Sequence, residues 1–274
     1  MNEKRKLYLI IGVVILFLMI LLIVKCVSEI RKELPRNYKE IRKEGILKVT
    51  CEYSNSSFRM EGDSTMGFYY ELAKIFAESK HLKIEVIPEN SLEKQKALLK
   101  NDMCDIIITG IMVTSESKDS SINYTTPILL DKQVLVQRKK ESVHDTGFVS
   151  SQLQLAKKVL YVPEHSNVIN RIHNLMQEIG DTIYVKELKK YNSEQLMAMV
   201  AHKDIDYAVC SRNTGQAATK YYPQLDMNTD ISFNQFYSWG VSGKQKELLS
   251  ALNQWIAQFK KTKKYKELIN KYYK

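Results

Sequence analysis

The most informative segment of this chain is Asp105-Ile-Ile-Ile-Thr-Gly-Ile-Met-Val-Thr-Ser-Glu-Ser-Lys118, followed closely by Tyr124-Thr-Thr-Pro127. Its apolar run, Ile106 to Ile108, is typical of a strand that is covered on both faces. Gly110 allows the backbone to turn and to approach another group closely. Hydroxyls and backbone amides follow at the carboxyl end of the strand, where open α/β sheets bind ligands. The segment is therefore either a plain strand with a polar exit loop or one wall of a binding site.

The N-terminal segment predicts a membrane anchor. Residues 7–24 of the 274-residue chain carry no charge, and about 18 such residues suffice to cross a bilayer. This run is longer than that of a cleaved signal peptide, and no A-x-A cleavage site lies near it. We expect an uncleaved anchor over residues 1–27, a charged stalk over residues 28–44 and a single-pass cell-membrane protein with its soluble domain in the periplasm. Lipidation of Cys26 is the alternative, although Lys25 stands where a small residue is wanted.

The net charge of +10 is concentrated at the two ends of the chain. Residues 1–50 hold eleven Lys and Arg against five Asp and Glu, and residues 255–274 hold seven against one, which leaves the middle slightly acidic. A nucleic-acid partner is therefore not expected. The basic C-terminal end is either a solvated surface or a site of attraction for anionic lipids or wall polymers.

Cysteine and histidine usage predicts neither a metal site nor a cofactor. The four cysteines include no CxxC pair, and the five histidines are scattered without a helical pair. Three cysteines, Cys51, Cys104 and Cys210, lie in or beside apolar runs, where a small buried hydrophobe is expected. The sequence thus indicates no disulfide framework.

Two similar units of alternating strands and helices follow the stalk, and they predict an α/β fold. In the first unit, strands are expected at 45–51, 82–87 and 106–108, and helices at 68–80 and 92–100. In the second unit, strands are expected at 158–162, 182–185 and 205–210, and helices at 166–176 and 193–202. Strands at 132–138 and 236–242 bracket the second unit, and helices at 245–259 and 265–273 end the chain. We expect two lobes with a cleft between them, one formed by residues 45–137 and 236–274 and the other by residues 138–235.

Several sequence blocks, in this order and spacing, carry a family resemblance. They are Gly45-Ile-Leu-Lys-Val, Met66-Gly-Phe-Tyr-Tyr-Glu-Leu-Ala73, the Asp105 segment with its Tyr124-Thr-Thr-Pro, Lys158-Val-Leu-Tyr-Val-Pro-Glu-His-Ser166 and the closing helices. Over residues 45–274 the chain resembles the extracytoplasmic solute-binding proteins of the polar-amino-acid type, family 3. It is similar as well to the N-terminal domain of membrane-bound lytic transglycosylases. The resemblance implies a two-lobed periplasmic-binding-protein-like fold of type II, with an ABC permease as a candidate partner.

Two departures from the family pattern argue against an ordinary α-amino acid as the ligand. Amino-acid binders of the family place an Arg directly after Thr-x-Glu, where it grips the ligand carboxylate. That position holds Ser117 here, with Lys118 beside it as a partial substitute. The second-lobe Asp that takes the ligand ammonium falls at Ser211, beside Arg212.

The candidate ligand contacts are aromatic, hydroxyl, amide and cationic groups at strand ends and helix starts. They are Tyr53, Phe58, Tyr69, Gly110, Thr114, Ser117, Lys118, Ser166, Asn167, Ser211 and Arg212. Each has a purely structural alternative: core packing for the aromatic residues, turn or helix capping for the hydroxyl and amide residues, and solvent exposure for Arg212.

The expected function is binding without catalysis. We expect a membrane-anchored extracytoplasmic protein that closes two lobes on a small polar solute, and we name no catalytic residue. The alternative is a peptidoglycan-fragment-binding or regulatory domain that is related to the lytic transglycosylases. Because the sequence ends at Lys274, just after the closing helices, we expect it to lack their catalytic domain.

Overall fold

The computed structural model describes residues 13, 15–23, 25, 36–113, 121–141 and 147–273. Residues Asn37–Lys274 form one compact unit, and Met1–Arg36 form another. Among the described residues, no helix has both the length and the apolar composition that crossing a bilayer requires. The expected anchor over residues 1–27 falls largely outside the described part, as does Cys26. Both therefore stay predictions.

The first lobe is built on a mixed sheet with strand order β4-β1-β5-β13-β6, to which β7 is added beside β13. Its strands are β1 (Ile46–Cys51), β4 (Lys83–Pro88), β5 (Ile106–Met112), β6 (Ile122–Tyr124), β7 (Leu129–Asp131) and β13 (Gln235–Ser242). Strands β4, β1 and β5 are parallel, and β13 runs antiparallel to β5. The helices are α3 (Phe68–Ser79), α4 (Leu92–Lys100), α8 (Lys246–Phe259) and α9 (Lys263–Tyr273), and a hairpin of β2 (Arg59–Glu61) and β3 (Ser64–Met66) precedes α3.

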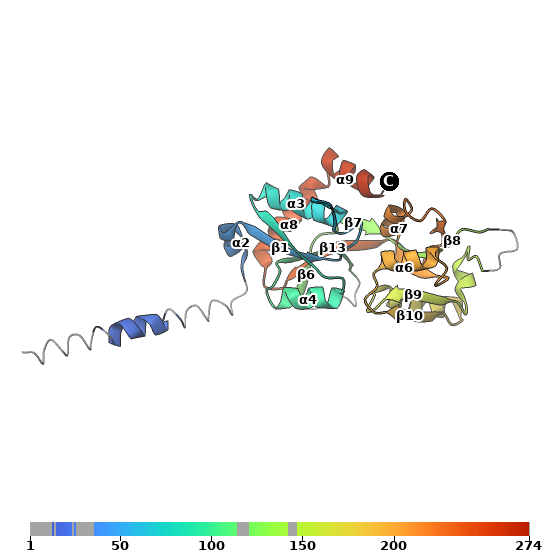
Figure 1. The fold of residues 1–274 in the computed structure, drawn as a ribbon, viewed down its shortest axis with the longest axis horizontal. Helices are drawn as coiled ribbons and strands as arrows, with labels where there is room; N and C mark the ends of the chain where they lie inside the picture. Colours follow the sequence, from blue (N-terminus) through green and yellow to red (C-terminus); the bar gives the residue numbers. More distant parts are fainter. Residues whose placement is uncertain are drawn as a thin grey trace, which may run out of the picture. The chain divides into compact units, whose positions relative to one another are not determined.

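Helices cover both faces of this sheet, which explains the unbroken apolar run in β5. Helices α3, α8 and α9 lie on one face and α4 on the other (Figure 1). Ile106 and Ile108 pack into the cluster of the first face, whereas Ile107 packs with Leu99 of α4. The buried strand predicted at residues 106–108 is thus confirmed, but it continues to Met112, so Gly110 lies within the strand and not at a turn.

The second lobe is a five-stranded sheet with order β10-β9-β11-β8-β12. Its strands are β8 (Gln133–Arg138), β9 (Val159–Pro163), β10 (Tyr184–Leu188), β11 (Ala208–Ser211) and β12 (Leu225–Asp226). Helix α5 (Val168–Ile179) packs on one face, and α6 (Ser193–Ala201) and α7 (Arg212–Ala218) pack on the other. A short 3-10 helix spans Gln152–Leu155. Because β10, β9 and β11 are parallel, their carboxyl ends meet at one edge.

Two expected boundaries differ from the structure. Strand β8 pairs with β11 and β12 of the second lobe, so the first crossing between lobes lies at Lys132 and not after residue 137. Helix α7, which the sequence analysis does not include, follows the strand expected at 205–210, and Ser211 caps it through a hydrogen bond from the backbone N–H of Thr214. A short helix with Gly215 inside it has a weak propensity signal, which is why the sequence did not indicate it.

Helix α2 (Tyr38–Glu44) corrects the stalk that was expected over residues 28–44. Asn37 caps α2 in a capping box with Glu40, which satisfies backbone N–H groups at its start. Ile41 is fully buried in the core of the first lobe. Residues 37–44 therefore belong to the folded domain, and residues 28–35 lie outside the described part.

Replacing Ile41 with valine should lower the free energy of unfolding by about 1 kcal/mol, because one buried methylene group is lost. Lys43→Ala is the control, since Lys43 is exposed on the same helix. Urea unfolding of both variants measures the difference. Equal midpoints would show that α2 does not contribute to the core.

Candidate ligand-binding cleft

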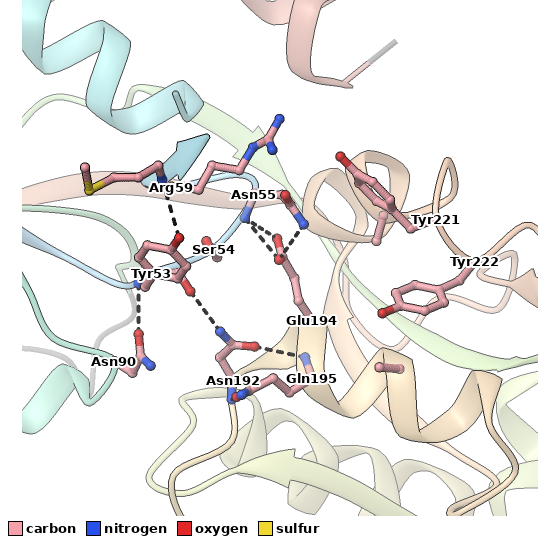
Figure 2. A pocket seen from close by; sticks show the side chains of 13 residues that line it. Tyr53, Ser54, Asn55, Arg59, Asn90, Asn192, Glu194, Gln195, Tyr221 and Tyr222 are labelled. Carbon is pink, nitrogen blue, oxygen red and sulfur yellow. Dashed lines mark hydrogen bonds between the residues drawn. The ribbon is translucent and has the colours of Figure 1, made fainter. Parts of the chain in front are cut away.

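A cavity of about 530 Å³ lies where the two lobes meet (Figure 2). Tyrosines and side-chain amides of both lobes line much of it. Its polar and aromatic lining residues include Tyr53, Asn55, Arg59, Asn90, Asn192, Glu194, Gln195, Tyr221 and Tyr222. A second cavity of about 410 Å³ adjoins it at Tyr53 and Asn90 and reaches Lys94, Glu164 and Tyr191. Such concave sites between lobes are the usual places for small ligands.

Loops at the carboxyl ends of parallel strands position these side chains. The backbone N–H of Tyr53, just after β1, donates to Asn90 Oδ1 beyond β4 at 2.8 Å. Across the cleft, Asn192 caps α6 and donates from Nδ2 to the carbonyl oxygen of Tyr53 at 3.1 Å. A single asparagine thus starts a helix in one lobe and contacts the backbone of the other.

Glu194 makes several hydrogen bonds to the first lobe. Its carboxylate accepts hydrogen bonds from the backbone N–H of Asn55 at 2.9 and 3.0 Å and from Asn55 Nδ2 at 2.9 Å. The backbone N–H of Ser56 also favours the charged form of this carboxyl. Burial raises the pKa of the Glu194 carboxyl, although these donors and Arg59 oppose the rise. The carboxylate is therefore desolvated but well supplied with donors.

Glu52, directly after β1, is a second buried carboxyl group and lies near Glu194. Burial and the charge of Glu194 raise its pKa to about 7, while a hydrogen bond from the Ser54 hydroxyl opposes the rise. Two carboxyl groups that disfavour each other's ionisation thus lie on opposite sides of the closed cleft.

The raised pKa of Glu52 predicts how stability depends on pH. Between about pH 4.5 and 7, folded Glu52 holds a proton that the unfolded chain releases, so its contribution to stability falls as pH rises through this window. We expect the Tm of the wild-type protein to fall from pH 5 to pH 8 more than that of Glu52→Gln, which cannot titrate there. Parallel Tm curves for the two proteins would contradict this assignment.

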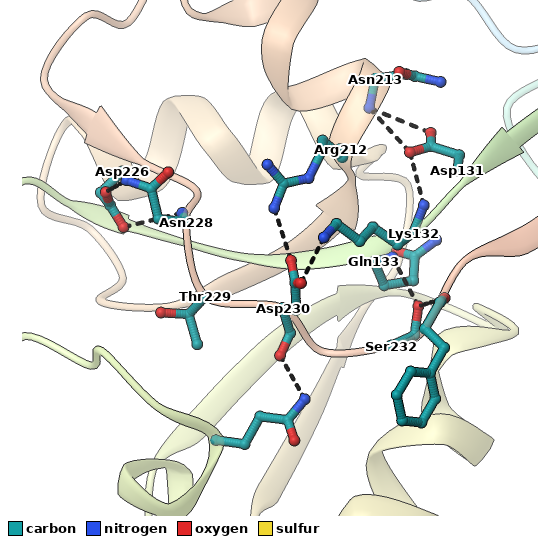
Figure 3. A network of polar contacts seen from close by, with 12 residues as sticks. Asp131, Lys132, Gln133, Arg212, Asn213, Asp226, Asn228, Thr229, Asp230 and Ser232 are labelled. Atoms are coloured by element: carbon teal, nitrogen blue, oxygen red, sulfur yellow. Dashed lines mark hydrogen bonds and ion pairs between the residues drawn. The ribbon is translucent and has the colours of Figure 1, made fainter.

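A polar network lies at the crossings between the lobes (Figure 3). Asp230 accepts from Lys132 Nζ at 2.5 Å and from Arg212 at 2.7 Å. Burial raises the pKa of Asp230, but hydrogen bonds from Lys132 and Arg212 outweigh it and hold that pKa below its ordinary value. Asp131 of β7 accepts from the backbone N–H of Asn213 at 3.2 Å. Arg212, which we expected to contact the ligand, is thus engaged in an ion pair.

The structure brings some of the predicted site residues to the cleft and places others elsewhere. Tyr53 lines both cavities and is 48% exposed. Phe58 and Tyr69 are buried in the first-lobe core, which is the alternative to ligand contact that the sequence analysis gives for aromatic residues. Gly110 packs against the Tyr69 hydroxyl. Thr114, Ser117 and Lys118 lie outside the described residues.

The hydroxyl and amide candidates of the second lobe lie at the N-termini of helices α5 and α7. Ser211 Oγ donates to Thr214 Oγ1 at 2.8 Å and accepts from the backbone N–H of Thr214 at 3.2 Å. Ser166 Oγ is 3.5 Å from the backbone nitrogen of Val168. Asn167 precedes α5 without a side-chain cap bond. None of the three lines the two cavities described above.

Sequence reasoning missed four polar residues that line the cleft, Asn55, Arg59, Asn192 and Glu194. It also missed Glu52, which interacts with Glu194. Glu52 directly follows the first strand, which is the position that open α/β sheets use for ligands, so its place in the sequence was a usable signal. Glu194 was hidden, because an acidic residue in a first helical turn is expected on any helix.

The fold and cleft define a class of two-lobed binding proteins. Residues 47–274 match the family described as bacterial extracellular solute-binding proteins, family 3. The chain belongs to this family, which confirms the resemblance inferred from the sequence blocks.

Solved structures of similar fold are amino-acid-binding proteins. A mutant of ArgBP from T. maritima has a TM-score of 0.70 at 22% identity, covering 85% of this chain and 97% of that one. The amino acid ABC transporter substrate-binding protein AbpA from Streptococcus pneumoniae, bound to L-arginine, has a TM-score of 0.71 at 19% identity, covering 86% and 97%. At these identities, the likeness shows the fold alone.

Curated relatives carry the name membrane-bound lytic murein transglycosylase F. The protein from Pseudomonas putida is 22% identical over 244 residues, which cover 88% of this chain and 49% of the relative. The protein from Desulfosudis oleivorans is 23% identical over 263 residues, covering 96% and 56%. The chain spans about half the length of these relatives.

Proposed function

We propose that the protein is a membrane-anchored, extracytoplasmic binding module that closes its two lobes on a small polar ligand other than a standard α-amino acid. The observation that carries the proposal is the cavity between the lobes, which is spanned by direct hydrogen bonds from Asn192 to Tyr53 and from Asn55 to Glu194. A ligand that contacts both lobes stabilises the closed form in proportion to its extra contacts there.

The cavity lining favours a ligand with amide groups. Asn90, Asn192 and Gln195 present side-chain amides, and Tyr53 and Tyr221 add aromatic faces. Amides pair with peptide-like groups through a donor and an acceptor each. At the position of the family's ammonium-binding Asp, Ser211 offers no charge of its own.

A peptidoglycan fragment is the second candidate ligand. It is supported by the relatives named as murein transglycosylases, with which this chain shares about half their length. Such fragments carry peptide amides and carboxylates, which fit an amide-lined cavity. Passing the ligand to an ABC permease and regulating a wall enzyme are the two roles that this binding would serve.

A thermal-shift screen of the full chain in mild detergent, with amino acids, dipeptides and muropeptides, tests the proposal. A ligand at 100 times its Kd should add about 2.7 kcal/mol to the free energy of unfolding, or roughly 5–10 °C in Tm. Tight binding of arginine or glutamine would overturn the exclusion of α-amino acids. Absence of any stabilising solute would leave a scaffold role.

Tyr53→Ala should abolish the shift, since Tyr53 lines both cavities. Tyr184→Ala is the matched control, because Tyr184 is similarly exposed and lines neither cavity. Equal binding by the two variants would place the ligand elsewhere.

A further inference from the structure

The Glu194 carboxylate lies in a site built from first-lobe groups. Asn55 supplies its backbone N–H to both carboxylate oxygens and its side-chain amide to one of them. The consecutive N–H of Ser56 also stabilises the charged form of this carboxyl and so lowers its pKa. Successive backbone N–H groups that converge in this way form an anion-binding nest. A carboxylate is therefore the chemical group that this turn accepts.

The nest is held in shape by the first lobe itself. The backbone N–H of Ser57 donates to Ser54 Oγ at 3.1 Å, and that of Ser54 donates to the carbonyl oxygen of Phe58 at 2.9 Å. The carbonyl oxygen of Ser56 accepts from the N–H of Phe68 at the start of α3, at 2.8 Å. Because none of these bonds involves Glu194, the donors keep their direction when Glu194 leaves.

The charges around the nest also suit an exchangeable anion. Arg59 lines the same cavity, and its Nε is buried without a hydrogen-bond partner among the described residues. Its ion-pair partner, Glu61, has a side chain that is 64% exposed, so that pair is weak. Burial disfavours the charge of Glu194, and that charge in turn raises the pKa of Glu52. Moving the Glu194 carboxylate into water therefore removes its desolvation penalty, which partly offsets the loss of its hydrogen bonds.

We propose that the Asn55–Ser56 turn is a carboxylate-binding subsite of the cleft and that Glu194 is its internal competitor. A ligand carboxylate replaces the Glu194 carboxylate on the same donors, while the ligand's amides contact the side-chain amides of the cavity. This inference rests on the proposed binding function and specifies its ligand as a peptide-like carboxylate. It also makes binding an exchange reaction in which one carboxylate leaves as another enters.

Hydrogen–deuterium exchange of the peptide that contains Asn55 and Ser56 tests the subsite directly, in the full chain. In Glu194→Ala, these amides should exchange about tenfold faster than in the wild type, since a charge-assisted acceptor is lost. N-acetyl-L-alanine should restore their protection in the variant, and N-acetyl-L-alaninamide should not. In the wild type, more N-acetyl-L-alanine should be needed for any Tm shift, because Glu194 competes.

Glu93→Ala is the matched control, since Glu93 also lies in the first turn of a helix but forms its ion pair with Lys96 at the surface. Unchanged exchange in Glu194→Ala, or equal protection by the acid and the amide, would overturn the subsite. Solutes that bind without regard to their carboxylate would sink this inference and leave the proposed function intact. If no solute protects or stabilises either protein in the wider screen, the proposed function fails as well. Asn55→Asp, which sets a second carboxylate against Glu194, should raise exchange in the same peptide and gives an independent variant.

Discussion

Gly67→Ala is expected to lower the free energy of unfolding by about 3–5 kcal/mol and to abolish ligand-induced stabilisation. The reason is twofold. Gly67 has φ +131°, which side chains rarely adopt, and a Cβ there would lie 2.2 Å from the carbonyl oxygen of Ser57 and 2.8 Å from the nitrogen of Phe58. Both contacts are with backbone, so no side chain can move aside. The displaced segment directly follows the carboxylate nest of Asn55 and Ser56.

Gly62→Ala is the control that separates backbone strain at a positive φ from the steric clash of an added Cβ. Gly62 also has a positive φ, +60°, but a Cβ added there would have no heavy atom within 4 Å. Its substitution should therefore cost only about 1–2 kcal/mol. Urea unfolding measures both variants, and thermal shift with a ligand from the screen measures binding. If Gly62→Ala and Gly67→Ala lose equal stability, the close approach of residues 57 and 58 does not matter.

Gly110→Ala is expected to cost about 2–4 kcal/mol, because it forces a buried ring out of its place. A Cβ on Gly110 would lie 1.9 Å from the Tyr69 hydroxyl and 2.5 Å from the ring carbon that bears it. Tyr69 belongs to the first-lobe core. Burial raises the pKa of Tyr69 well above its ordinary value, and the nearby Asp131 and Tyr237 add to the rise. The hydroxyl therefore stays neutral, and it fills the space that glycine leaves on β5.

Gly240→Ala is the control on the neighbouring strand β13. A Cβ there would meet only the ends of isoleucine side chains, the nearest being Ile111 Cδ1 at 3.2 Å. These ends can shift by a few tenths of an ångström, so we expect a loss of about 1 kcal/mol. Denaturant midpoints and near-UV circular dichroism compare the two variants. A Gly110→Ala protein as stable as Gly240→Ala would show that Tyr69 has room to rotate.

The architecture was predictable because it follows from local patterns. The helix at 92–100 with its Ser91 cap and the buried strand at 106–108 are both present, since their signals lie in adjacent residues. Helix α7 and strand β8's place in the second sheet were not predictable in the same way. The place of β8 depends on pairing between residues far apart in sequence, which a local pattern does not encode. Helix α7 was missed because its local propensity signal is weak.

The candidate site was harder to predict for a similar reason. Tyr53 was expected and lines the cleft, but Phe58 and Tyr69 turned out to be core residues. Aromatic residues next to a strand have the same sequence signature in both roles. The bond between Asn55 and Glu194 joins residues 139 positions apart. Only the closure of one lobe on the other brings them together.

The ion pairs of Asp230 determine which contacts survive when the cleft opens. Asp230, which precedes β13, forms ion pairs with Lys132 at the first crossing and with Arg212 of the second lobe. If the lobes rotate about the crossings, the displacement of a residue grows with its distance from the axis of rotation. The contact between Asp131 and Asn213, beside the axis, should persist through a small rotation. We expect the bonds of Glu194 to Asn55 and of Asn192 to Tyr53 to break when the lobes separate, because each joins a side chain of one lobe to the other lobe.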